Sequence, residues 1–471
     1  MPSANIAFDN IPATIRTPGI YTEFNTKMAV NTLPANLYRV LIIAQRLAAG
    51  TVAANTPVDV FSDEDAAIYF GRGSVAHLAV RAAIKANRYL SLQCIALDDA
   101  AAGVVATGTV TIAGTATGSG ALRLTVNNQH VDIAIASGDA ASAIATALNA
   151  QIALQPDLPV TATVLAGAVT LTAKHKGTLG NAIKLSTLVQ AAGVTATVVA
   201  MANGLNDPDI TAALTAVYSA GHNILISAFN DTTNVTALRT HINAVSGPQE
   251  KRRVRAVVAH TGTYAQATTL AASVNSGRIL EVLDPNADES VYEVAAAMGA
   301  VAASEEDPAR PLNGMELVGL TPPPMANWLS ETQIEAALHN GVTPTRVGPG
   351  NVVQIVRAIT SYTLNANGVP DISMLDWTTI GTLDYTATAI EQRIALRFPR
   401  DKKSVRTRAR LGDEIYNVLI KLEELEIIEM VQKSDVLIED DLVDPSRYDV
   451  RINVNVVNGL HVIAQRLDLI L

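Results

Sequence analysis

Glycine-rich and acidic turns are the first segments whose residue types could do chemistry. The segment GRGSVA at 71–76 has the glycine spacing of a dinucleotide-binding turn, but it follows a helical pattern and no acidic residue stands about 20 positions later. The segment DPNAD at 284–288 begins like a calcium loop, yet Glu289 replaces the turn glycine and Ala295 replaces the bidentate glutamate. We interpret both segments as ordinary turns that precede helices.

Nucleophilic and metal-binding side chains form no recognisable set. His77, His222, His241 and His339 fall on expected helices or their ends without the spacing of metal ligands. The sequence has no P-loop, no His-Glu-x-x-His motif and no Gly-x-Ser-x-Gly motif. Cys94 lies in an apolar run typical of a strand, which favours a buried, inert thiol and excludes a disulfide framework. We therefore expect no catalytic residue, no cofactor and no metal site.

Charge and composition narrow the class of protein. The chain carries 34 basic and 44 acidic residues, a net charge of −10, which argues against nucleic-acid binding. Charged residues make up 17% of the 471 residues, against about 25% in average globular proteins. Such a surface suits a protein that packs against copies of itself, and a large Ala-rich soluble enzyme fits the composition equally well. The sequence holds no basic, apolar leader and no long uninterrupted apolar stretch, so we expect synthesis in the cytoplasm and no membrane insertion.

Strand-like and helical patterns alternate from residue 38, which predicts a mostly parallel sheet covered by helices. The alternation stops at 99, where Thr-, Gly- and Val-rich β runs begin, and it resumes at 206. We expect an α/β plus α+β multidomain protein. Its expected parts are an N-terminal extended arm and linker (1–37), an α/β domain (38–98 and 206–345), an inserted β-rich surface domain (99–205) and a C-terminal α+β domain (346–471).

Two helices are expected near the start of the C-terminal domain. A loop at 343–350 and a strand at 351–363 lead to a helix at 384–397, which Pro399 ends. In the following helix, at about 411–429, apolar residues recur with the i, i+4, i+7 spacing of one buried face. The second helix is therefore expected to bury one side.

Both ends of the chain carry strand-like segments. Ile452, Val454 and Val456 alternate with polar residues, and Asn458-Gly459 after them predicts a terminal β-hairpin with a two-residue turn. The second arm of that hairpin matches the first poorly, and no segment of the body obviously pairs with either end of the chain. The strand-like residues at the ends are Gly19, Ile20, Tyr21, Thr22, Glu23 and Phe24, and Val462, Ile463, Leu467, Leu469 and Leu471.

Basic residues gather between 393 and 410, and acidic residues between 413 and 444. One interpretation is a solvated charged face. Another is that the basic block faces an acidic partner while the acidic block meets a neighbouring copy. Nucleic acid is disfavoured, because the basic block has almost no interleaved aromatic residues. The basic residues considered for a partner contact are Arg393, Arg397, Arg400, Lys402 and Lys403.

Three segments carry a resemblance to a known family. The segment RTPGIYTEF at 16–24 resembles the N-terminal Pro-Gly-Val-Tyr-x-Glu arm of the contractile tail sheath proteins of bacteriophages. The segment KGTLGN at 176–181 is similar to a recurrent sheath segment. The C-terminal order of helix, helix, strand and hairpin, with DPSRYD at 444–449 just before the expected hairpin, also resembles the family. The Ala- and Thr-rich inserted module is similar to that of the Mu-like branch.

The resemblance implies a fold and a mechanical function. The α/β domain would have a subtilisin-like topology, which is a likeness of fold alone. HTGT at 260–263 vaguely resembles a protease histidine motif, but its partner motifs are missing from the sequence, so no triad is expected. The subunits would form stacked hexameric rings around a tail tube, and contraction would drive the tube through the host envelope and deliver the genome.

The resemblance also assigns roles to the two ends of the chain. Segment 19–24 and the residues from Val462 to Leu471 would add as strands to the sheets of neighbouring subunits, with Ile452, Val454 and Val456 in the acceptor sheet. The basic residues would face the tube. The implied partners are the chain itself, the tail tube protein, and baseplate and tail terminator proteins. The implied location is the virion tail sheath, with assembly in the host cytoplasm. A tube or capsid subunit and a serine hydrolase are the alternatives.

Overall fold

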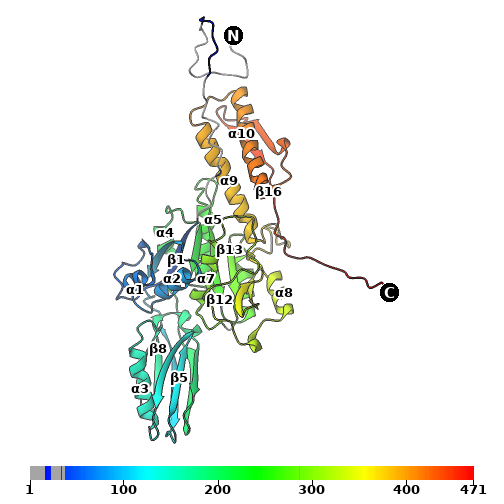
Figure 1. The fold of residues 1–471 in the computed structure, drawn as a ribbon. Coiled ribbons are helices and arrows are strands. Elements are labelled where there is room, and N and C mark those ends of the chain that lie inside the picture. The colour runs from blue at the N-terminus through cyan, green and yellow to red at the C-terminus, as the bar shows by residue number, and fades with distance from the viewer. Residues whose placement is uncertain (1–15, 23–32, 34–37, 286, 471) are drawn as a thin grey trace.

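Residues 16–22, 33, 38–285 and 287–470 are described by the structure, which is a computed structural model. The molecule is elongated, with a β-rich part at one end, a large mixed sheet in the middle and two long helices at the other end (Figure 1). The last described residues leave the body as an extended tail (Figure 1). The predicted mixed α/β multidomain architecture is confirmed.

The middle part is built on an eight-stranded sheet. Strands β1, β3 and β11 to β14 run parallel, whereas β2 and β15 pair antiparallel at the two edges. The order across the sheet is β15-β14-β13-β12-β11-β1-β3-β2. The strand bounds are β1 (Arg39–Gln45), β2 (Pro57–Asp59), β3 (Ser91–Leu97), β11 (Ile224–Ser227), β12 (Arg255–His260), β13 (Ile279–Leu283), β14 (Thr343–Gly348) and β15 (Val352–Ile355).

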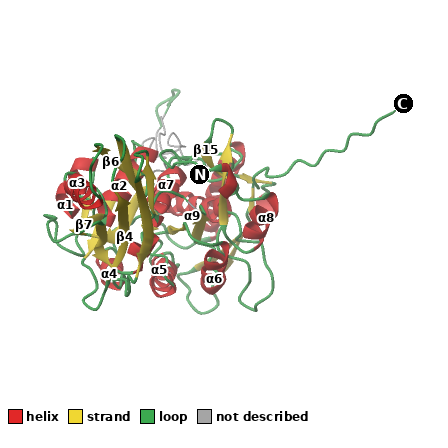
Figure 2. Cartoon of the chain, turned by 90° about the horizontal axis from the view of Figure 1, so that it is seen from below, coloured by secondary structure: helices red, strands yellow, loops and turns green. Residues whose placement is uncertain are grey.

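Helices cover both faces of this sheet, as the alternating pattern predicted. Helices α2 and α7 pack together on one face, while α4, α5 and α6 lie in a row on the other (Figure 2). Residues 40–44 of β1 are therefore fully buried, which explains their uninterrupted apolar run. The helix bounds are α1 (Asp63–Phe70), α2 (Val75–Ala86), α4 (Thr211–Ala216), α5 (Thr232–Val245), α6 (Tyr264–Val274), α7 (Val291–Ala302) and α8 (Glu331–His339).

The segment between β3 and α4 forms two antiparallel sheets of its own, ordered β10-β4-β8-β7 and β6-β5-β9. Its buried residues, between Ala106 and Met201, form a cluster separate from that of the eight-stranded sheet. Helix α3 packs on both sheets. The bounds are β4 (Val105–Gly114), β5 (Gly120–Val126), β6 (Gln129–Ile135), α3 (Ala141–Ala153), β7 (Val160–Leu165), β8 (Ala168–Lys176), β9 (Leu185–Val189) and β10 (Val194–Ala202).

Two long helices form the other end of the molecule. Helix α9 (Trp377–Arg397) begins earlier than expected, because its Thr- and Gly-rich first turns pack on the middle part, with Trp377 and Ile380 buried. Helix α10 (Val405–Glu424) packs along α9 and buries Ile415, Val418, Leu419 and Leu422, which confirms the predicted buried face. Helix α10 ends at Glu424, earlier than the expected 429, and Glu426 just after it adopts a positive φ of 57°.

Two expectations for the segments around these helices are wrong. The expected loop at 343–350 is mostly strand β14, and the expected strand at 351–363 is limited to β15. The chain after the last strand is not the second arm of a hairpin, because residues 457–470 form no regular structure. Neither Asn458 nor Gly459 has the positive φ that a type I′ turn requires.

Candidate subunit-linking surfaces

Four short strands after α10 form two consecutive two-stranded antiparallel sheets. β16 (Ile428–Glu429) pairs with β19 (Asn455–Val456), and β17 (Val436–Asp440) pairs with β18 (Tyr448–Ile452). A short helical turn, η3 (Lys433–Asp435), separates β16 from β17. We call these four strands the ribbon. Segment 442–450, at its far end, is the turn before β18 and the start of that strand.

The ribbon lies on the helix pair through one apolar face. Ile452 and Val454 pack against the cluster that Ile415 and Leu419 of α10 help to form, and Val456 is half-buried. Arg451, Asn453 and Asn455 are exposed. The predicted alternation along this segment is therefore confirmed. The acceptor role of Ile452, Val454 and Val456 stays a prediction.

Both outer edges of the ribbon are open within the part of the chain that the structure describes. Each of the four strands has one hydrogen-bonded neighbour and none on its other side. A two-stranded sheet is marginally stable by itself in water, and an open edge presents unpaired N–H and C=O groups to another strand. The two edges are therefore candidate sites for pairing with a further strand.

The C-terminal residues are extended and exposed, and lie away from the ribbon (Figure 1). Val462 is 79% exposed, Ile463 68%, Leu467 96% and Leu469 85%. No described residue pairs with this segment as a strand. Leu471 lies outside the described residues. We call residues 462–471 the C-terminal arm.

The N-terminal segment is also exposed where it is described. Ile20 is 99% exposed, and Gly19 and Thr22 are exposed as well. The hydroxyl of Tyr21 donates a hydrogen bond to the carbonyl of Thr17, 3.0 Å away. Glu23 and Phe24 lie outside the described residues. We call residues 16–24 the N-terminal arm.

The basic block is largely engaged in contacts within the chain. Arg393 Nε lies 2.7 Å and Arg397 Nε 3.7 Å from Glu414 Oε2, and both arginine side chains are about nine-tenths buried. Lys403 Nζ lies 2.9 Å from Asp440 Oδ1. These three residues hold α9, α10 and the ribbon together, which the linear charge pattern could not reveal.

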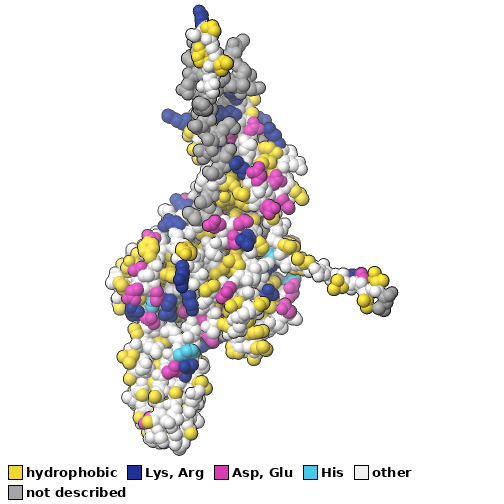
Figure 3. Space-filling view, viewed as in Figure 1, with side chains coloured by type: hydrophobic (Ala, Val, Ile, Leu, Met, Phe, Trp, Pro, Cys, Tyr) yellow, Lys and Arg dark blue, Asp and Glu magenta, His cyan; other side chains and the backbone are white. Residues whose placement is uncertain are grey.

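Arg400 and Lys402 differ from these three residues, because both are exposed. They lie in the turn between α9 and α10, at the end of the molecule where basic side chains are visible in Figure 3. The expected partner contact therefore fits Arg400 and Lys402 better than the rest of the predicted set.

An arginine cluster, missed by the sequence reasoning, joins the helix pair to the middle part. Arg278 makes a two-pronged ion pair with Asp384 of α9, with N–O distances of 2.7 and 2.8 Å. The guanidinium of Arg255 lies 4.2 Å from the ring centre of Trp377, and its Nη1 donates to the Trp377 carbonyl. The sequence signal that could have indicated this cluster is KRRVR at 251–255, a run of basic residues that leads into a buried strand.

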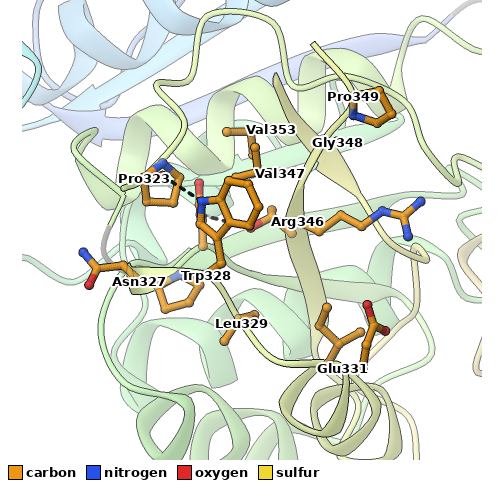
Figure 4. A pocket seen from close by; sticks show the side chains of 14 residues that line it. Pro323, Asn327, Trp328, Leu329, Glu331, Arg346, Val347, Gly348, Pro349 and Val353 are labelled. Atoms are coloured by element: carbon orange, nitrogen blue, oxygen red, sulfur yellow. Dashed lines mark hydrogen bonds between the residues drawn. The ribbon is translucent and has the colours of Figure 1, made fainter. Parts of the chain in front are cut away.

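One pocket among the described residues contains a buried acid. A pocket of about 460 Å³ opens beside Trp328, which lies between Pro323 and Val347 (Figure 4). Its buried acid, Asp284, accepts a hydrogen bond from the Thr345 hydroxyl at 3.0 Å, and burial raises the pKa of Asp284 to about 7. No histidine, cysteine or lysine lines the pocket.

The other chemical motifs are structural as well. Gly71 and Gly73 form the turn between α1 and α2, with φ of 87° and 75°. His260 Nε2 lies 3.0 Å from Glu281 Oε1, a buried pair between β12 and β13. The described residues hold no cluster of histidine, cysteine and acidic side chains able to bind a metal ion. Within the same residues, no helix is both long enough and apolar enough to cross a membrane.

Comparison with known proteins agrees with this architecture. Residues 203–361 match the family model of the phage tail sheath protein central domain, and residues 369–470 match that of the phage tail sheath C-terminal domain. The chain is 33% identical to the Mu-like prophage FluMu tail sheath protein of Haemophilus influenzae, over 99% of this chain and 100% of that protein.

Solved structures show the same fold. The sheath tail protein from Desulfitobacterium hafniense superposes with a TM-score of 0.53 at 15% identity, covering 94% of this chain and 97% of that one. A chain of the anti-feeding prophage baseplate in its contracted state gives 0.54 at 11% identity, covering 96% and 99%. The chain thus belongs to the phage tail sheath family, in its Mu-like form, and is a structural component of a contractile phage tail rather than an enzyme.

Proposed function

We propose that this sheath subunit polymerises by strand exchange, with its N- and C-terminal arms filling the open edges of ribbons in neighbouring subunits. One observation carries the proposal. The ribbon has two open edges, and the described residues of the two terminal segments, 16–22 and 457–470, form no strand with any other described residue. The acceptor edge would belong to the segment that contains Ile452, Val454 and Val456, and the donated residues include Ile20 and Leu467.

The energetics favour many weak links rather than one strong link. A backbone hydrogen bond contributes about 1 kcal/mol net, while ordering one residue costs about 1–2 kcal/mol. The surplus must come from apolar side chains such as Leu467 and Leu469, at about 1.5–3 kcal/mol for each one fully buried. A single link is therefore modest, and the several links of a subunit act together.

We further propose that the subunits form stacked hexameric rings around a tail tube and that contraction drives the tube through the host envelope for genome delivery. In support, the fold is shared with the anti-feeding prophage helical sheath in its contracted state, with a TM-score of 0.52 at 12% identity. Strand-paired arms would keep subunits connected while their linkers bend. The linkers expected from the sequence are 25–37, of which only residue 33 is described, and 442–450, whose last three residues belong to strand β18.

The positions of the basic residues suggest how the subunit would contact a tail tube. We propose that Arg400 and Lys402 face an acidic tube wall, with Arg393, Arg397 and Lys403 holding the turn that presents them. Baseplate and tail terminator proteins would cap the two ends of the sheath. Assembly would take place in the host cytoplasm. A tube or capsid subunit and a serine hydrolase lose their support, because the matched family models are those of sheath proteins.

We also propose the domain boundaries of 1–37, 38–98 with 206–345, 99–205 and 346–471. Support comes from the separate buried cluster within 99–205. The parallel strands covered by helices on both faces are compatible with a subtilisin-like topology for the α/β domain. The inserted domain, at the far end from the helix pair, would be an outward-facing surface with no ligand.

Deletion of either arm tests the strand exchange. Chains lacking residues 1–24 or 462–471 should fold and remain monomeric, because the described residues of both segments, 16–22 and 462–470, are exposed. Negative-stain electron microscopy should show striated cylinders for the full chain and none for either deletion. Normal cylinders from a deleted chain would refute the exchange.

A further inference from the structure

The C-terminal arm does not begin where the ribbon ends. After β19 the chain crosses to the base of α9, and His461 is the last half-buried residue before the exposed arm (Figure 1). The amide Nδ2 of Asn313 donates a hydrogen bond of 2.6 Å to Nδ1 of His461. On its other side, the Nε2 of His461 lies 3.5 Å from Oδ1 of Asp376, and only 12% of the imidazole side chain is exposed.

The partner Asp376 is itself firmly held. It precedes α9 as the N-cap residue, and its two carboxylate oxygens accept hydrogen bonds of 2.9 Å from Nε and Nη2 of Arg357. Asn313 belongs to a segment bound to the edge strand β15, where the Gly314 N–H donates to the Ile355 carbonyl at 2.8 Å. His461 therefore lies between two anchored parts of the body and is hydrogen-bonded to one of them through Asn313.

Gly459 makes this contact possible. A Cβ at that position would lie 2.9 Å from Cε1 of His461 and 3.1 Å from Cβ of Pro311. Any larger residue would push the imidazole away from Asn313. The glycine that the sequence suggested for a hairpin turn thus has another role, because the ring folds back over it.

We propose that His461 is a latch that fixes the root of the C-terminal arm to the base of α9, so that the arm moves freely only from Val462 onward. The inference rests on the proposed strand exchange. His461 acts as a positioning residue, which sets where the donated strand leaves the subunit and in which direction it points. Burial and the nearby Arg357 lower the pKa of His461, so the ring is neutral at pH 7 and its Nδ1 can accept the Asn313 hydrogen bond.

The latch shortens the tether, which is the stretch of chain between the last fixed residue and the donated strand. From His461 to Leu467 is six residues, and from Val456, the end of the ribbon, to Leu467 is eleven. The effective concentration of a tethered strand falls roughly as the −3/2 power of tether length, so loss of the latch lowers it about two- to threefold. Because the starting direction is lost as well, this range is a lower limit.

The critical concentration for sheath polymerisation, measured by sedimentation of the full chain, tests the latch. His461→Ala should raise it by about two- to threefold or more, with the circular dichroism spectrum unchanged. Asn313→Ala, which removes the other half of the hydrogen bond, should have the same effect and replaces His461→Ala if that variant fails to fold. His339→Ala, an exposed histidine on α8, is the matched control and should leave the value unchanged.

An insertion distinguishes an effect of tether length on the critical concentration from an effect of lower subunit stability. Five Gly/Ser residues placed between His461 and Val462 leave the latch intact but lengthen the tether by the same amount. This insertion should raise the critical concentration as His461→Ala does. An unchanged value for the latch variants, or for the insertion, would overturn the latch. Normal polymerisation of a chain lacking 462–471 would instead show that the proposed strand exchange itself is wrong.

Discussion

Arg278, which directly precedes the interior strand β13, and Asp384 join the central sheet to helix α9 through two parallel hydrogen bonds of 2.7 and 2.8 Å. Only 17% of each side chain is exposed, so water screens the pair weakly. Arg278 also donates to the carbonyl of Val254. The helix that carries the ribbon is therefore fixed to the middle part by charge as well as by apolar packing.

Removing either charge should weaken this junction. We expect Asp384→Ala to lower the free energy of unfolding by about 2–4 kcal/mol, because it leaves a mostly buried guanidinium without its carboxylate. Urea unfolding measures the loss. A double-mutant cycle with Arg278→Ala should give a coupling of at least about 1 kcal/mol. The exposed pair Arg466–Asp468 in the C-terminal arm is the control and should show almost no coupling.

Two helical glycines should respond in opposite ways to alanine. A Cβ on Gly381 of α9 would lie 2.7 Å from Nη1 of Arg255, which stacks on Trp377, whereas a Cβ on Gly412 of α10 would meet only Ile438 Cδ1 at 3.6 Å. Alanine favours a helix over glycine by about 1 kcal/mol, while overpacking costs about 1–3 kcal/mol. Thermal unfolding should show Gly412→Ala stabilised and Gly381→Ala destabilised. A stabilised Gly381→Ala would contradict the tight contact.

Asp284 should make the subunit less stable as the pH rises. Burial raises its pKa from 3.8 to about 7 in the folded chain, so the folded state prefers the protonated acid. The resulting penalty is absent below pH 3.8, grows as the pH rises towards 7 and is complete above it. Its size is on the order of 2–4 kcal/mol, from about 1.4 kcal/mol for each pH unit.

Unfolding of Asp284→Asn by urea at pH 5 and pH 8 measures this effect. The variant should lose less stability between the two pH values than the natural chain does. Glu331→Gln, an exposed acid at the rim of the same pocket, should keep the natural pH dependence. Equal pH dependence in all three proteins would rule out Asp284 as the source.

Substitutions of the exposed and of the buried basic residues near the turn between α9 and α10 should cause different defects. Charge reversal of Arg400 and Lys402 should reduce assembly on the tail tube while leaving tube-free polymers and subunit stability unchanged, because both side chains are exposed. Yield of tube-bound sheaths by electron microscopy measures this effect. Arg393→Ala should instead lower subunit stability by about 1–3 kcal/mol, since it breaks a buried ion pair with Glu414. Unchanged tube-bound yield after the charge reversal would exclude the tube contact.

The buried core could be predicted from the sequence better than the contacts between distant segments. The run at 40–44 and the spacing of Ile415, Val418 and Leu422 indicate burial directly, because burial sets the period of apolar residues. Strand β14 was missed because Pro344 and Gly348 suggest a loop. Pro344 is tolerated there because it stands near the start of the strand.

The errors at the C-terminal end have the same origin. Asn458-Gly459 is a strong local hairpin signal, yet the packing of His461 and Pro311 around Gly459 decided the conformation. The partner of Arg393 is 21 residues away in sequence, and that of Arg278 is 106 residues away. No local pattern identifies such partners, so the sequence alone left the basic block open to several interpretations.

The open edges of the ribbon give a sheath built by strand exchange two chemically different ends. Every interior subunit would both lend and receive its β-strands, but a terminal layer lacks neighbours on one side. One extremity would then display vacant docking sites and the opposite one unengaged tails. Two unrelated capping proteins could therefore each recognise a single extremity, which would give the growing cylinder a fixed polarity from its first layer.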